Sequence, residues 1–175
     1  MIQGLSKISE IATVRRLSSD DVEQIYALSL GNPLFYEYCP PAVTLESIRA
    51  DMAALPPGKT MKDKYYMGFF VKDTLAAVLD LIVGYPADKT AWIGLFMMHP
   101  DFQGQGLGSR IIGALLEDLR HSGFDRVRLA YASGNPQSEA FWLKNGFEKT
   151  GQISDQGDYQ AVLMEKRLPP KEVTL

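Results

Sequence analysis

The chain has 175 residues, of which 46% are hydrophobic and 22% charged, and its formal net charge is -3. This length suits one domain with a substantial hydrophobic core. We expect residues 1–168 to form that domain and residues 169–175 to form a flexible tail. The negative charge argues against a dedicated nucleic-acid binder, because such proteins usually carry a strong basic excess.

The low numbers of cysteines and histidines and the short apolar stretches exclude further classes of protein. The single cysteine, Cys39, forms neither an intramolecular disulfide nor a cysteine-rich zinc site, and two histidines leave little for a histidine-based metal centre. No secretory apolar core follows Met1, and the apolar stretches are too short to cross a bilayer. We therefore expect a cytoplasmic protein without a bound metal or a membrane partner. The formation of a homodimer remains an open alternative.

The first third of the chain predicts one strand and two helices. The strand covers residues 14–17, and polar and acidic residues then begin a helix over 18–31. A second helix is predicted for 44–55, before two prolines. The aromatic, proline-bounded segment 34–41 between the helices is predicted to be a packed loop.

The middle of the chain changes to strands. Residues 65–71, 75–83 and 91–98 have the composition of strands and are separated by turn residues. Residues 91–98 are almost continuously apolar, which is typical of a strand covered on both faces.

Helices and strands alternate in the last third. The clearest helix covers 106–121, with apolar residues at helical spacing along one wide face. A strand is predicted for 126–131, and a helix begins at Asn135 with proline in its first position. Two closing strands are predicted for 147–151 and 159–166. This order of helices and strands indicates a mixed fold of the α/β (α+β) class.

A glycine-rich turn over residues 103–108 precedes the clearest helix. The first amides of a helix lack partners and lie at the positive end of its dipole. Glycines at 104, 106 and 108 would let a pyrophosphate approach the backbone, so an acidic protein would hold a polyanion with neutral amides. Ser109 stands where a Rossmann fingerprint needs its third glycine, and no P-loop lysine follows. A turn without a ligand is the alternative.

Two motifs in this order resemble the GNAT superfamily of N-acetyltransferases. Residues 97–108 resemble its central motif, which has a strand, His-Pro or similar, an aromatic residue and Gln/Arg-x-x-Gly-x-Gly/Ala. Asn135 and residues 139–147, which end in Gly-Phe, resemble the second motif. The resemblance covers residues 65–166 well. It implies a mixed, mostly antiparallel twisted sheet of about seven strands flanked by about four helices.

The resemblance also implies an activity. It implies an enzyme that transfers the acetyl group of acetyl-CoA to a primary amine by direct attack in a ternary complex. We favour a small polar or cationic amine, because Phe35, Tyr36 and Tyr38 around Glu37 could form an aromatic cage with a carboxylate. The alternative is that these aromatic side chains only pack the proline-rich loop onto the core. A protein or peptide acceptor and a non-catalytic acyl-CoA sensor are the alternatives.

The family pattern also implies where the coenzyme would bind. Backbone amides of residues 104–109 would hold the pyrophosphate, and main-chain groups of Phe96 and Met98 would pair with the pantetheine arm. The Met98 amide would polarise the thioester carbonyl, and Asn135 would bind pantetheine, cap its helix, or do both. The complete predicted set is Phe96, Met97, Met98, Gln103, Gly104, Gln105, Gly106, Leu107, Gly108, Ser109, Arg110, Asn135, Ser138 and Trp142.

The sequence departs from the family pattern at the position of the general acid. Trp142 stands where many members have a tyrosine that protonates the departing thiolate. The alternative donors are Tyr131, Ser138 or water, and a further alternative is that the thiolate leaves without a donor.

A second departure concerns the general base. The strand 91–98 contains no acidic residue to deprotonate the incoming ammonium group. The alternative bases are Glu37, Asp80, His99 and Asp158. Among all these candidates we assign catalysis to Met98, Glu37, Asp80 and Tyr131.

Overall fold

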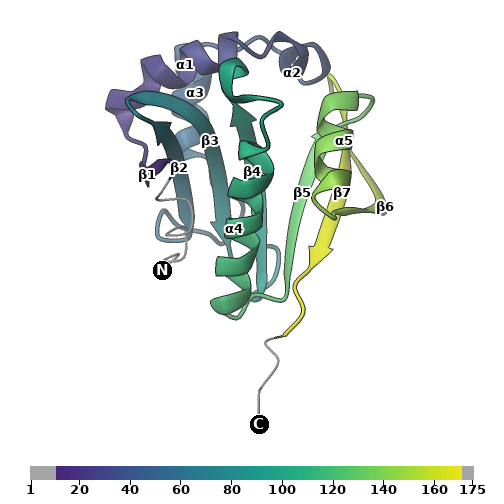
Figure 1. Cartoon of the computed structure of the whole chain (residues 1–175). Coiled ribbons are helices and arrows are strands. Elements are labelled where there is room, and N and C mark those ends of the chain that lie inside the picture. The colour runs from purple at the N-terminus through teal and green to yellow at the C-terminus, as the bar shows by residue number, and fades with distance from the viewer. Residues whose placement is uncertain (1–10, 171–175) are drawn as a thin grey trace.

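The computed structural model describes residues 11–170 (Figure 1). Residues 1–10 of the expected domain and 171–175 of the expected tail lie outside the described residues. Seven strands form one sheet in the order β1-β2-β3-β4-β5-β7-β6. Only β4 and β5 pair in parallel, and the other neighbours are antiparallel. The strands are β1 (Thr13–Arg16), β2 (Lys64–Val71), β3 (Thr74–Val83), β4 (Thr90–Met98), β5 (Arg126–Ala132), β6 (Glu148–Asp155) and β7 (Gln160–Arg167).

The predicted fold class is confirmed, with one more helix than expected. Within residues 11–170 the helices are α1 (Val22–Leu30), α2 (Pro33–Tyr38), α3 (Leu45–Ala53), α4 (Leu107–His121) and α5 (Pro136–Lys144), and two 3-10 helices are η2 (Ser19–Asp21) and η3 (Pro100–Phe102). The prediction of a loop over 34–41 was wrong, because α2 occupies most of it. Proline at its first position is preorganised for a helix, and the Cys39 amide closes its last turn on the Phe35 carbonyl.

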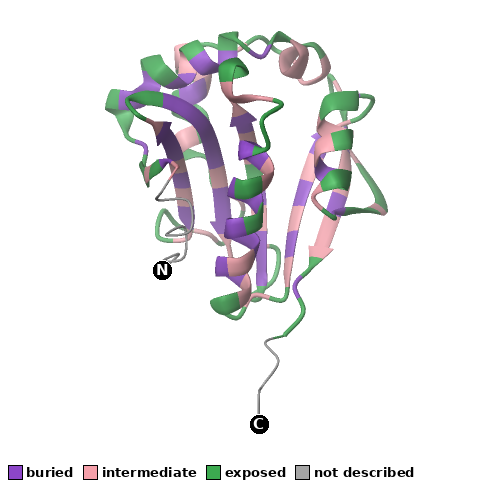
Figure 2. Ribbon diagram, in the orientation of Figure 1, coloured by how far each residue is buried: buried purple, intermediate pink, exposed green. Residues whose placement is uncertain are grey.

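Helices cover both faces of the sheet. Helices α4 and α5 lie on one face, with α4 in front of β3 and β4 in Figure 1. One core cluster contains the inner face of α4, where Ile111, Leu115 and Leu119 are fully buried, together with Phe69 of β2. A second cluster joins α1 and α3 to residues such as Val78 of β3. Figure 2 shows the buried residues concentrated in β2, β3, β4 and α4.

Strands β4 and β5 separate halfway along their length. Their parallel pairing ends at Ile93 and Leu129. In the β3–β4 ladder Asp80 pairs with Leu95 and Leu81 with Ile93, so Gly94 is an extra residue in a bulge. A bulge bends its strand, and the rest of β4 diverges from β5 (Figure 1). This opening positions the site.

No helix among residues 11–170 is long and apolar enough to cross a membrane.

Candidate active site

The turn before α4 leaves its backbone accessible. Gly104 and Gly106 have φ angles of 72° and 80°, a left-handed region that favours glycine. A Cβ atom at either position would meet no atom within 4 Å. Gly106 caps α4 without a side-chain hydrogen bond, so the first amides of the helix are available to a ligand. This arrangement suits an anion.

A cavity of ≈ 320 Å³, here called the helix-side cavity, lies between this turn, the end of β4 and α5. All the predicted coenzyme-binding residues line it except Gln105, Leu107 and Arg110. Gln105 is exposed and bonds the Asp101 carbonyl, Leu107 is buried in the core, and Arg110 is exposed.

A second cavity, of ≈ 540 Å³, is here called the sheet-side cavity. Its lining includes Trp92, whose neighbours Ala91 and Ile93 belong to the core cluster under α4. Successive side chains of a strand point to opposite faces, so this cavity lies on the face away from α4. The two cavities are adjacent, because they share the lining residues Phe35, Phe96, Asn135, Ser138 and Trp142.

The main chain of β4 faces the opening at alternate residues. The His99 amide donates to the Ala76 carbonyl over 2.8 Å, and Met98 is the register partner of Ala77. Bonded and non-bonded pairs alternate in an antiparallel ladder, so the amides and carbonyls of Met98 and Phe96 point away from β3. These groups therefore face the opening between β4 and β5.

Asn32 holds the end of β4, and the sequence did not single it out. It lies just after α1 and is 9% exposed. Its side-chain amide donates to the Met98 carbonyl over 3.0 Å and to the Leu28 carbonyl over 2.9 Å. Its oxygen accepts from Gln103 over 2.8 Å, and Gln103 also donates to the Met98 carbonyl over 3.1 Å. No local signal identifies Asn32, because its partners Met98 and Gln103 are 66 and 71 residues away.

Asn135 caps α5 and is 1% exposed. Its side-chain oxygen accepts hydrogen bonds of 3.1 Å from the amides of Gln137 and Ser138. The structure therefore uses its carboxamide oxygen as a helix cap beside both cavities.

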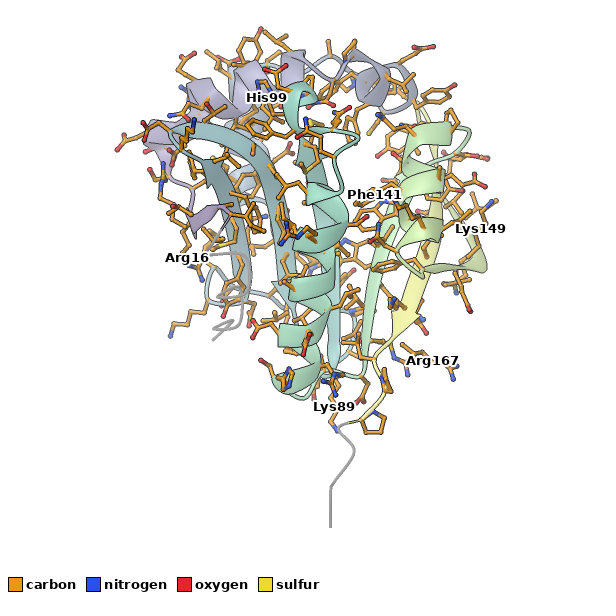
Figure 3. The ribbon with its side chains drawn as sticks, viewed as in Figure 1. Arg16, Lys89, His99, Phe141, Lys149 and Arg167 are labelled. Carbon is orange, nitrogen blue, oxygen red and sulfur yellow. The ribbon has the colours of Figure 1, made fainter. Side chains whose placement is uncertain are left out.

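Aromatic side chains of α5 fill the space beside β4. Trp142 is 7% exposed and lies against Phe96, Phe141 and Phe147, with ring centroids 5.0 to 6.1 Å apart. Phe141 stacks on Phe96 at 5.6 Å and extends from α5 toward α4 (Figure 3). A Cβ atom at Gly108 would lie 3.2 Å from the Phe141 ring, so glycine permits this close approach of α4 and α5.

Asp80 has 13% of its side chain exposed and lies next to Gly94, a lining residue of the sheet-side cavity. Its Oδ2 accepts from Lys64 over 2.9 Å, and Lys64 is 1% exposed and also donates to the Ala54 carbonyl. Its Oδ1 is buried and has no hydrogen-bond partner among the described residues. Burial raises the pKa of Asp80, although the hydrogen bond from Lys64 opposes the rise. A Cβ atom at Gly94, a lining residue, would lie only 2.9 Å from Asp80 Oδ2.

Tyr131 lines the sheet-side cavity but directs its hydroxyl toward α5. The hydroxyl donates to Glu139 over 2.8 Å, and Glu139 accepts from Lys149 over 2.7 Å. Burial, followed by the hydrogen bond to Glu139, raises the pKa of Tyr131. Its hydroxyl therefore keeps its proton at neutral pH.

The other candidates for the base lie elsewhere. Glu37 is exposed on α2 and lines neither cavity, and Asp158 is exposed between β6 and β7. His99 accepts a hydrogen bond from the Asp101 amide and caps η3. Within residues 11–170, no three His, Cys, Asp or Glu side chains are grouped to hold a metal ion.

A curated relative of this chain is an acetyltransferase. The chain is 29% identical over 92 residues to the tRNA(Met) cytidine acetyltransferase TmcA of Pyrococcus furiosus. The match covers 53% of this chain but only 10% of that protein, so the chain spans about a tenth of the length of this relative.

Solved structures of acetyltransferases share the fold. An acetyltransferase from Thermus thermophilus matches with a TM-score of 0.72 and 21% identity, covering 90% of this chain and 97% of that one. The ribosomal-protein-S18-alanine N-acetyltransferase of Escherichia coli matches with a TM-score of 0.67 and 17% identity, covering 94% of this chain and 99% of that one. The spermidine N-acetyltransferase of Vibrio cholerae, solved with CoA and spermine, matches with a TM-score of 0.67 and 16% identity. The match covers 91% of this chain and 96% of that one.

The family itself follows from the sequence match. A model of the acetyltransferase (GNAT) family matches residues 32–147, which is well over half of the chain. The matched segment includes both motifs, the glycine turn and the helix capped by Asn135. The chain therefore belongs to the acetyltransferase (GNAT) family, whose enzymes use acetyl-CoA as the acyl donor.

Proposed function

We propose that this chain transfers the acetyl group of acetyl-CoA to a primary amine by direct attack in a ternary complex. The observation that carries this proposal is that two adjacent cavities share lining residues at the opening between β4 and β5. A thioester held in the helix-side cavity and an amine in the sheet-side cavity would meet there. No covalent enzyme intermediate is needed for such a transfer.

The residues around the helix-side cavity fit acetyl-CoA. The amides of 104–109 bind the pyrophosphate in this proposal, supported by two left-handed glycines with open space above them. The main chain of Phe96 and Met98 holds the pantetheine arm as an added strand would, and the Met98 amide polarises the thioester carbonyl. Bound acetyl-CoA supplies the acyl group and a thiolate leaving group, with a pKa near 8.5 for thiols of this kind.

Asp80 is the proposed base. Its carboxyl lies against the backbone of Gly94, and its raised pKa makes it more basic than an ordinary aspartate. A water molecule beside Gly94 would relay the proton from the ammonium group to Asp80. Glu37 has less support, because it is exposed on α2, whereas Asp80 lies against Gly94, a lining residue of the sheet-side cavity.

Tyr131 is the proposed donor of a proton to the departing thiolate. Its hydroxyl keeps a proton that it donates to Glu139 in this structure, so the transfer requires the hydroxyl to rotate from Glu139 toward the sulfur. The Trp142 indole has no acidic proton to give, so its role is packing against Phe96.

The proposed acceptor is a small polar or cationic amine, supported by the aromatic lining of the sheet-side cavity. The aromatic cage expected around Glu37 is only partly assembled there, since Phe35 lines both cavities while Tyr36 packs with the core under α1. A protein N-terminus is the second candidate, because structures of the same fold include an enzyme named for a ribosomal protein acceptor.

Release of free thiol from acetyl-CoA across a panel of amines and peptides tests the proposal. We expect release that depends on the amine, and a fall in kcat of about 100-fold or more in Asp80→Asn. Asp73→Asn, an exposed carboxyl in the β2–β3 turn, is the matched control. Calorimetric binding of CoA without thiol release from any acceptor would instead identify a sensor.

A further inference from the structure

The sheet-side cavity extends well beyond the opening where an amine would react. From Phe96 it follows β4 back to Trp92, four residues or about 13 Å at strand spacing. Its far end is formed by Tyr85, Pro86, Trp92 and Arg128. A volume of ≈ 540 Å³ is that of a site for a whole small molecule, so the cavity has room for the tail of an acceptor.

Two aromatic rings form a preorganised corner at this far end. The rings of Tyr85 and Trp92 meet edge to face, with centroids 6.0 Å apart and planes at 80°. The Tyr85 amide donates to the Thr90 carbonyl over 3.0 Å, which ties the loop before β4 to the strand. An aromatic ring of a ligand stacks favourably in such a corner.

Small residues connect the corner to the opening. Gly94 on β4, Ala130 and Ala132 on β5, and Ala161 on β7 all line the cavity. Gly94 is exposed, and a Cβ atom at this position would lie only 2.9 Å from Asp80 Oδ2, so a larger residue would clash there. A flexible linker of a ligand would therefore lie along these small residues without a steric clash.

The charge of the lining selects against a second ammonium group. Among the described residues that line the cavity there is no Asp or Glu, and the cation present is Arg128. Arg128 bonds Glu165 over 2.6 Å, and Glu165 also lies within 3.5 Å of Arg126 and 3.9 Å of Arg167. Glu165 thus pairs with three guanidinium groups, so this end offers a cationic tail no carboxylate of its own.

We propose that Tyr85 and Trp92 form a subsite for an aromatic ring on the tail of the acceptor. The preferred substrate is then a primary amine joined to an aromatic ring by a flexible linker, and not a polyamine. This inference rests on the proposed acetyl transfer and identifies the class of its acceptor.

A series of ω-phenylalkylamines with linkers of one to six carbons tests the subsite. The n-alkylamines and α,ω-diaminoalkanes of matched length are the controls. We expect kcat/KM, measured by thiol release, to pass through an optimum with linker length and to exceed the matched diamine about tenfold or more there. Trp92→Ala should reduce the preference for the phenyl group, Trp92→Phe should retain part of it, and Met61→Ala, 54% exposed outside the cavity, should keep it.

The outcomes separate this inference from the proposed function. If simple alkylamines or diamines react at least as well as every phenylalkylamine, the subsite is wrong while acetyl transfer stands. If no amine releases thiol, the proposed function fails and the subsite with it. Calorimetry with CoA checks that Trp92→Ala is folded, and the series with the unaltered protein decides the question even where that variant does not fold.

Discussion

The side-chain amide of Asn32 donates a hydrogen bond of 3.0 Å to the backbone carbonyl of Met98, 66 residues further along the chain. The same carbonyl accepts from Gln103, the first residue of the glycine turn. Asn32 thus ties the end of α1, the open end of β4 and the start of the turn at one point. The Met98 carbonyl is satisfied by these bonds, and its amide faces the opening.

Asn32→Ala should disturb the coenzyme site more than the fold. It removes two donors and one acceptor from a nearly buried group, which costs about 1–3 kcal/mol of stability. We expect KM for acetyl-CoA to rise more than kcat falls, because the variant loosens the position of Gln103 and Met98. Asn145→Ala, which loses the bond to the Phe141 carbonyl at the far end of α5, is the control. Equal changes in KM for both variants would contradict a positioning role for Asn32.

Gly106→Ala should weaken the binding of CoA. A left-handed alanine costs about 1–2 kcal/mol, and its methyl group would enter the space where we place the pyrophosphate. Gly58→Ala is a matched control, since Gly58 has φ 78° and equally open surroundings but lines neither cavity. Both variants should lose similar stability in urea unfolding. Only Gly106→Ala should bind CoA about tenfold or more weakly in calorimetry, and equal affinities would remove the turn from the site.

Lys64→Met should move the acidic limb of the pH–rate profile upward. The Asp80 carboxylate must be ionised to act as a base, so activity falls as pH drops through its raised pKa. The hydrogen bond and charge of Lys64 lower that pKa, and their removal therefore raises it further. The limb should shift to higher pH in Lys64→Met and should be absent from any residual activity of Asp80→Asn. An unmoved limb in Lys64→Met would assign the base to another group.

Asp21→Asn should lower stability at neutral pH but not in acid. Asp21 is 4% exposed, and hydrogen bonds from Arg15 of 2.7 and 2.9 Å hold its pKa below the ordinary value. A lowered pKa stabilises the folded state above the unfolded pKa of 3.8, and this contribution is lost as pH falls through the folded pKa. Urea unfolding should show a loss of about 1–3 kcal/mol for the variant at pH 7 and a smaller difference below pH 3.8. A difference that does not change with pH would contradict the role of this ion pair.

Local sequence determined the elements whose signals lie within a few residues. The apolar spacing of α4, the glycines of the turn before it and the Asn135-Pro136 start of α5 all depend on neighbours in the chain, and the structure has each where it was predicted. The short helix α2 was missed, because its aromatic residues and prolines resemble a packed loop. The strand predicted for 147–151 continues to Asp155, since the turn residue Gly151 lies within an irregular stretch of β6.

Tertiary structure decided the rest of the site, because its contacts join residues far apart in the chain. The opening between β4 and β5 follows from a register that ends at Ile93, and no local pattern encodes where a parallel pairing stops. Asp80 acquires its environment from Lys64 on another strand and from the missing side chain of Gly94 on a third. Asn32 reaches Met98 only once α1 has packed against the sheet. Long-range packing therefore sets the burial, charge and direction of these groups, whereas the backbone of the glycine turn is determined by its own residues.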